Sequence, residues 1–240
     1  MLVFEKEKIS QRKASLIIGI TMFIMTICAA LAFVVIHNSL IIKGDATATM
    51  NNILESISLF RAEILCWLII LLCDITVSWA LYIYLKQVDK SLSLLGAWLR
   101  LFYSAILAIA ISNLFYVLLL LNGNNYLASI QIDQLKAQLM LFVNTFTNVW
   151  SFGLIIFGLH LFVVGYLALK SNFIPKLLGI LLLIASFSYI IIHLFHLFIP
   201  QYENTTLFLE KILSLPMIAG ELGFGLWLLI KGGKVPKISS

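Results

Sequence analysis

The sequence predicts an all-α membrane protein with six transmembrane helices, and two observations carry that prediction. The first is composition: 62% of the 240 residues are hydrophobic and only 11% are charged, whereas a soluble domain is about 45–50% apolar and about 25% charged. The second is that the apolar residues are gathered into six long runs. The mean hydropathy of +1.05 agrees, and together these features exclude an ordinary soluble protein.

Each apolar run is long enough to cross a hydrocarbon core, which takes roughly 20 residues of helix. Backbone groups in lipid must pair within the segment, so each run is expected to be a helix. The chain has no room for a second soluble domain, and residues 1–240 are interpreted as one transmembrane domain. The predicted spans cover residues 14–36, 64–85, 99–121, 146–169, 177–199 and 212–230.

The distribution of Lys and Arg predicts the orientation. Cytoplasmic segments of membrane proteins are enriched in these residues. With the N-terminus inside, twelve of the 16 basic residues fall on the cytoplasmic side. The four on the outer side are Lys43, Arg61, Lys136 and Lys211. We therefore expect both chain ends in the cytoplasm, and a bacterial inner (cytoplasmic) membrane as the location.

The loop before the second span has a helical pattern of its own. Between Ala46 and Arg61, apolar residues recur at Met50, Ile53 and Ile57 with polar residues between them. This spacing is typical of an amphipathic helix. We expect a helix on the outer surface that leads into the second span, lying in the headgroup region or covering a cavity.

Three ionisable residues lie well inside the predicted spans, where charge is costly and side chains of this kind usually face the bundle interior. Asp74 is 12 residues from Lys86, and His160 and Glu221 are each 10 residues from Lys170 and Lys231. At 1.5 Å per residue, these are about 18, 15 and 15 Å from the cytoplasmic lysines. The three side chains are therefore predicted near the midplane, at one level, facing the interior with at least two in contact.

Two further residues are candidates for the same site. Asn113 lies about 20 Å from Arg100 by the same count, at a similar level. Arg100 opens the third span, either as an anchor at the membrane boundary or as an inward cation paired with a carboxylate or phosphate. Asp74, His160, Glu221, Arg100 and Asn113 could bind an ion, a proton or a small polar ligand, or could only join the helices to one another.

Other chemistry is not expected. His193 and His196 share a helix face, but no closed set of metal ligands accompanies them, so we predict neither a metal nor another cofactor. No catalytic residue stands out. The net charge of +5 comes from basic residues at the ends of apolar runs, and we expect lipid headgroups rather than nucleic acid as their partners.

Four ordered motifs resemble a bacterial membrane family, catalogued as domain of unknown function 4386. They are Asp74 through Leu81-Tyr82 to Lys86, Ala97-Trp98-Leu99-Arg100-Leu101, Gly158-Leu159-His160-Leu161 through Gly165-Tyr166 and Pro175 to Leu178-Gly179-Ile180, and Gly220-Glu221-Leu222 with Trp227 to Gly232. The resemblance extends over nearly the whole chain. It implies a bacterial inner-membrane protein and supplies no activity.

Our leading hypothesis is a non-enzymatic membrane protein that binds or moves a small polar or cationic species at the level of Asp74, His160 and Glu221. The alternative from another class is an intramembrane enzyme acting on a lipid or isoprenoid substrate, with Arg100 directed toward its phosphate. A third is a structural, sensory or accessory protein whose polar residues bind no ligand.

Overall fold

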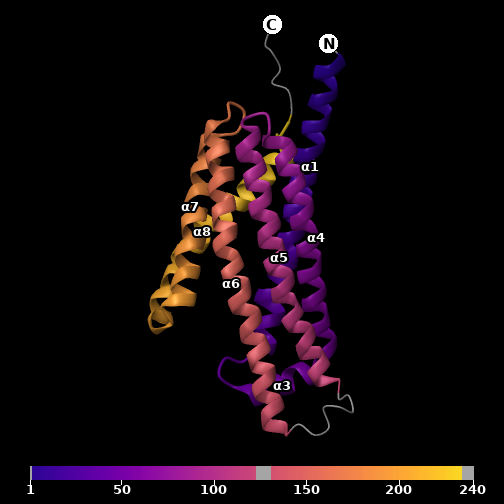
Figure 1. Cartoon of the computed structure of the whole chain (residues 1–240), viewed down its shortest axis with the longest axis vertical. Coiled ribbons are helices and arrows are strands. Elements are labelled where there is room, and N and C mark those ends of the chain that lie inside the picture. The colour runs from indigo at the N-terminus through magenta and orange to yellow at the C-terminus, as the bar shows by residue number, and fades with distance from the viewer. Residues whose placement is uncertain (1, 123–130, 234–240) are drawn as a thin grey trace. The chain divides into compact units, whose positions relative to one another are not determined.

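The regular structure of the protein is helical throughout the part that the computed structural model describes, residues 2–122 and 131–233 (Figure 1). The elements are α1 (Leu2–Ala29), η1 (Ala30–His37), α2 (Asn38–Leu40), α3 (Ala46–Glu55), α4 (Ile57–Leu85), α5 (Lys90–Leu121), α6 (Ile132–Lys170), α7 (Lys176–Phe198), η3 (Pro200–Tyr202) and α8 (Glu203–Ile230).

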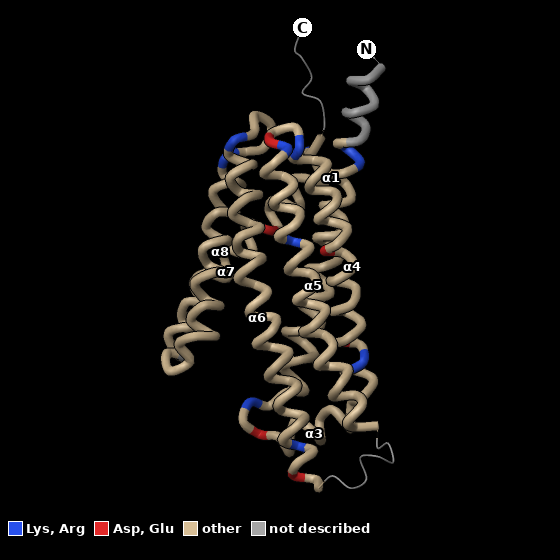
Figure 2. Tube along the Cα trace, in the orientation of Figure 1, with Lys and Arg blue, Asp and Glu red and all other residues tan. Residues whose placement is uncertain are grey.

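Six helical segments in these residues are long and apolar enough to cross a membrane. They are Gln11–Leu40, Ile57–Leu85, Lys90–Leu121, Ile132–Lys170, Lys176–Phe198 and Asn204–Ile230. The six predicted spans lie within them, apart from one residue at the end of the fifth. The prediction of an all-α protein with six helices of spanning length is confirmed. Charged residues are sparse along these helices and gather near helix ends (Figure 2).

The loop before the second long helix contains the short helix α3. Asp45 caps it, since its carboxylate accepts a hydrogen bond of 2.8 Å from the Ala48 N–H. Met50 and Ile53 are buried and Leu54 is exposed. The backbone leaves the helical conformation at Ser56, so α3 and α4 are separate helices. The position of α3 on an outer membrane surface stays a prediction.

The first long helix changes its winding near its end. Residues Ala30–His37 form the π-helical segment η1, and the N–H of Asn38 donates to the carbonyl oxygens of both Ile36 and Phe33. Wider turns of this kind are uncommon in helices and occur frequently at functional sites. The segment ends at His37, a buried residue.

The chain forms two compact units. Unit 1 contains Met1–Ile24, Cys73–Ser104 and Phe152–Ser240, and unit 2 contains Met25–Leu72 and Ala105–Ser151. Each unit has buried polar residues of its own.

Helices in unit 1 approach one another closely where small residues occur. Helix α7 packs against α8, and a Cβ added at Gly220 would lie 2.9 Å from the carbonyl oxygen of Leu181. Ser186 of α7 donates a 2.7 Å hydrogen bond to the carbonyl of Gly158 in α6. Small residues and serine-to-backbone bonds are typical of helix contacts in membranes.

The C-terminal end of α8 is held by Arg12 of α1, also in unit 1. The guanidinium donates to the carbonyl oxygens of Gly232 at 2.7 Å and Leu229 at 3.0 Å. The last carbonyls of a helix lack partners within the helix, and a cation there also offsets the negative end of the helix dipole. Arg12 therefore joins the first and last helices of the unit.

Candidate functional site

The register of α4 against α5 creates the polar site of unit 1. Ser93 donates to the carbonyl of Tyr82 at 3.1 Å, and Ser78 donates to the carbonyl of Ala97 at 2.7 Å. The residue numbers fall along α4 as they rise along α5, so the two helices are antiparallel. One turn further in the same direction, Asp74 of α4 meets Arg100 of α5.

Asp74 and Arg100 form a buried ion pair. Arg100 Nη2 lies 2.6 Å from Asp74 Oδ1, and the side chains are 3% and 0% exposed respectively. The guanidinium carbon also lies 5.3 Å from the ring centre of Phe157, within the range of a cation–π contact. Of the two readings that the sequence left open for Arg100, the structure has the inward cation paired with a carboxylate.

His160 of α6 contacts the other side of Arg100. Its Nδ1 lies 2.8 Å from the carbonyl oxygen of Gly96, and its Nε2 lies 3.2 Å from Arg100 Nη1. A carbonyl can only accept and a guanidinium can only donate, so Nδ1 carries the proton and Nε2 does not. The contacts therefore define a neutral imidazole of one tautomer.

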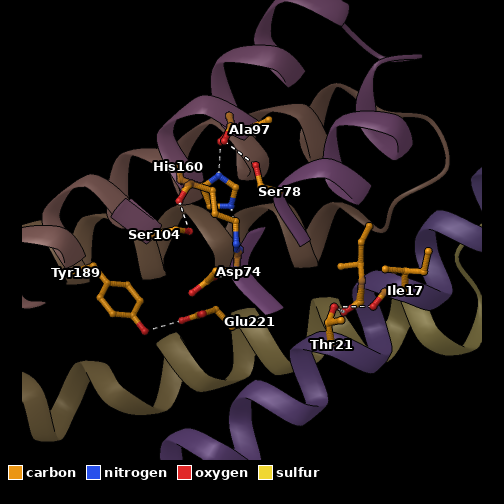
Figure 3. Close-up of polar contacts among 12 residues, drawn as sticks. Ile17, Thr21, Asp74, Ser78, Ala97, Ser104, His160, Tyr189 and Glu221 are labelled. Atoms are coloured by element: carbon orange, nitrogen blue, oxygen red, sulfur yellow. Dashed lines mark hydrogen bonds and ion pairs between the residues drawn. The ribbon is translucent and has the colours of Figure 1, made fainter. Parts of the chain in front are cut away.

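Glu221 of α8 lies beside this group and has a different partner. Tyr189 of α7 donates a 2.7 Å hydrogen bond to Glu221 Oε1 (Figure 3). The Glu221 carboxylate is close enough to Arg100 and Asp74 to interact with both electrostatically. Glu221 is half-buried, whereas Asp74 is fully buried. Tyr189 also packs edge-on against Phe157, with ring centres 5.3 Å apart.

The structure brings together four of the five residues that the sequence analysis singled out. Asp74, Arg100 and His160 are in direct contact, and Glu221 is next to them. Asn113 is separate: it belongs to unit 2, and its amide donates to the carbonyl oxygens of Ile109 and Ala110 in its own helix.

Tyr189 is the member that sequence reasoning missed. It lies 13 residues after Lys176, about 20 Å along the helix by the count used for the acids and histidine. A search for phenolic hydroxyls at the same level would have found it. Its hydroxyl provides the hydrogen bond that orients Glu221.

Charge is the chemical property that distinguishes this site. It contains two carboxylates, one guanidinium and an imidazole that the hydrogen bonds keep neutral. Asp74 and Arg100 cancel, which leaves Glu221 as the group whose ionisation sets the net charge. In the described residues no group of three or more His, Cys, Asp or Glu side chains is arranged to hold a metal ion. The arrangement suits a proton or another small cation.

The residues that the structure describes contain six apolar helices of spanning length, with a charged cluster among four of them, and these features define a multi-pass membrane protein. The chain belongs to the family described as domain of unknown function (DUF4386), whose model matches residues 17–232. It is also similar to an uncharacterized protein of Archaeoglobus fulgidus, with 33% identity over 174 residues, which cover 72% of this chain and 85% of that protein. No solved structure matches. The family membership inferred from the four motifs is confirmed.

Proposed function

We propose that this protein binds a small cation, and foremost a proton, at Glu221 in the polar site of unit 1, and that it moves this cation across the membrane. The observation that carries the proposal is the imbalance of two carboxylates and one guanidinium around a neutral imidazole. One additional positive charge makes the site neutral.

The energetics favour occupancy by a cation. An ionised carboxylate in an apolar environment costs several kcal/mol unless it is paired, and such groups take up a proton instead. Asp74 has Arg100 as its counter-ion at 2.6 Å. The phenol of Tyr189 stabilises a negative Glu221 by one hydrogen bond and adds no positive charge. Glu221 is therefore the group on which the exchangeable proton would reside.

Exposure supports the same assignment. Asp74 is 0% exposed, whereas Glu221 is half-buried and has one oxygen that Tyr189 does not bind. Of the two acids, Glu221 is therefore the more exposed. His160 and Arg100 then act as positioning residues that hold the Asp74 charge fixed.

The lipid-enzyme alternative receives less support from the geometry. A substrate phosphate would need the fork of Arg100, which is already engaged by Asp74 and His160 inside the unit. Its side chain is only 3% exposed. A purely structural role for the cluster is the remaining rival, and the experiment below separates it from cation binding.

The test uses the purified full-length protein in lipid vesicles. Infrared difference spectra after a change of pH report protonation of individual carboxyl groups. We expect a carboxyl signal that disappears in Glu221→Gln and persists in Glu210→Gln, a matched change on the same helix. Vesicles loaded with a pH-sensitive dye should acidify under an imposed potential with the wild-type protein and not with Glu221→Gln.

Loss of thermal stability in Glu221→Gln, with no carboxyl signal in the wild type, would support the structural role and contradict the proposal. A carboxyl signal without dye acidification would support binding without movement.

For the location we also propose that the N- and C-termini are cytoplasmic in a cell inner membrane and that α3 lies at the outer surface. The lysine and arginine distribution supports this orientation.

A further inference from the structure

A second buried acid lies in unit 2 and has no part in the site described above. Glu63 of α4 is 0% exposed, and its Oε1 lies 2.7 Å from Nδ1 of His37, whose side chain is 8% exposed. His37 is the last residue of η1. The pair therefore joins the π-helical end of the first long helix to the start of the second.

Two polar atoms beside this pair lack hydrogen-bond partners in the described part of the chain. They are Glu63 Oε2 and the indole Nε1 of Trp67, both buried. Each unsatisfied buried group costs about 1–3 kcal/mol. One atom accepts and the other donates, so a single molecule that both donates and accepts satisfies both. Water is the smallest such molecule, and buried water commonly occupies such positions.

The sequence spacing places these two groups on one face. Glu63 and Trp67 are four residues apart in α4, and side chains at this spacing are neighbours, with about 5–6 Å between Cβ atoms. Two side chains at this spacing can reach one water molecule between them, which would hydrogen-bond to each at roughly 2.7–3.2 Å. The bridge would fix the second oxygen of Glu63 as His37 fixes the first.

Two aromatic rings contact the histidine, and one of them also contacts Trp67. The ring of Phe33 stacks on His37 with centres 5.4 Å apart, and the Phe146 ring centre is 5.8 Å from it. Trp67 contacts Phe146 at 5.3 Å and Trp150 at 4.8 Å. Aromatic faces within about 6 Å stabilise a cation. The rings of Phe33 and Phe146 are therefore placed to stabilise a positive charge on the His37 imidazole.

The pair is neutral when it holds one proton, whether as imidazole with carboxylic acid or as imidazolium with carboxylate. A second proton gives an imidazolium beside a neutral acid, and the aromatic rings stabilise that cation. Among the described residues, Cys66 lies near Glu63, and Cys28 lies near Cys66.

We propose that His37 and Glu63 form a second proton-binding site, with a water molecule that bridges Glu63 Oε2 and the Trp67 indole. The proposal is independent of the function assigned to Glu221, because it rests on different residues in the other unit.

The test is nuclear magnetic resonance of the full-length protein with nitrogen-15 in its tryptophan indoles. The sequence has five tryptophans, and Trp67→Phe identifies the signal of Trp67 by its loss. In the wild type we expect a cross-peak between the Trp67 indole proton and a bound water. We also expect the Trp67 signal to shift with pH.

The pH-dependent shift should vanish in Glu63→Gln and persist in Glu55→Gln, a matched change at an exposed position of unit 2. It should also persist in Glu221→Gln, which separates the two sites. Absence of the water cross-peak in the wild type would overturn the bridging water. A pH-dependent shift that survives in Glu63→Gln would overturn the proton site. If Glu63→Gln does not fold, a wild-type Trp67 signal that stays unchanged over the pH range would overturn the proton site.

Discussion

Arg100 Nη2 lies 2.6 Å from Asp74 Oδ1, and neither side chain is more than 3% exposed. In an apolar interior each charge depends on the other, because removal of one member leaves an uncompensated buried charge. The pair is thus an obligatory feature of unit 1 and a prerequisite for the charge balance around Glu221.

Asp74→Asn should lower the free energy of unfolding by about 3–5 kcal/mol, since it leaves Arg100 charged and buried. Thermal unfolding in detergent measures the change. Asp89→Asn is the matched control, because Asp89 pairs with Lys170 at 2.9 Å among partly exposed side chains. Equal melting temperatures for the two variants would contradict the buried pair.

The tautomer of His160 leads to a second prediction. His160→Gln keeps a donor for the Gly96 carbonyl and an acceptor for Arg100, whereas His160→Phe removes both. We expect His160→Phe to unfold more easily than His160→Gln by about 1–3 kcal/mol, the cost of unsatisfied buried groups. Unfolding curves of the two purified variants decide this, and a more stable phenylalanine variant would count against the assignment.

The approach of α7 and α8 gives a third prediction. A Cβ at Gly220 would lie 2.9 Å from the backbone oxygen of Leu181, whereas a Cβ at Gly223 would lie 3.4 Å from Leu178 Cδ2, an ordinary contact. Gly220→Ala should therefore destabilise the protein by about 1–3 kcal/mol through overpacking. Gly223→Ala should change the melting temperature little. Similar losses in both variants would argue against close packing at Gly220.

Much of the fold could be predicted because a membrane leaves the backbone few choices. A long apolar run must form a helix in lipid, and the six predicted ranges match the long helices for that reason. Helix counting also singled out Asp74, His160 and Glu221, which are rare residue types in such runs. Periodicity could not predict that Arg100 lies between Asp74 and His160, because that depends on the register of three helices.

His37 and Glu63 in unit 2 are polar residues that the sequence analysis did not single out. The predicted spans end at Ile36 and begin again at Ile64, one residue short of His37 and Glu63 in each case. A polar residue at the end of an apolar run predicts the end of a span. In the structure both helices continue through these residues, and the two side chains satisfy one another. An unpaired polar group is costly inside a span, which is why it predicts a span end. Pairing across helices removes that free-energy cost, so a polar residue need not mark the end of a helix.

The pair of Asp89 and Lys170 predicts a pH dependence of stability. The hydrogen bond from Lys170 holds the pKa of Asp89 below its ordinary value. A depressed folded-state pKa stabilises the fold above the unfolded pKa of about 3.9, and that contribution is lost as the pH falls through the folded value. The melting temperature of wild type should exceed that of Asp89→Asn near neutral pH, and the difference should shrink in acid. A difference that grows in acid would contradict the sign.

The orientation of the spans gives the last prediction, which follows from the basic residues. With Cys28, Cys66 and Cys73 replaced, single cysteines can be introduced at Asp45, at Asp133 and at Asn172. A thiol reagent that does not cross membranes should label the first two positions in intact cells, and Asn172 only after the membrane is opened. Three of the long apolar helices lie between Asp45 and Asn172, so these positions must be on opposite sides whichever way the protein is inserted. Equal labelling of Asp45 and Asn172 would therefore contradict the number of spans, whereas a complete reversal would contradict only the cytoplasmic placement of the N-terminus.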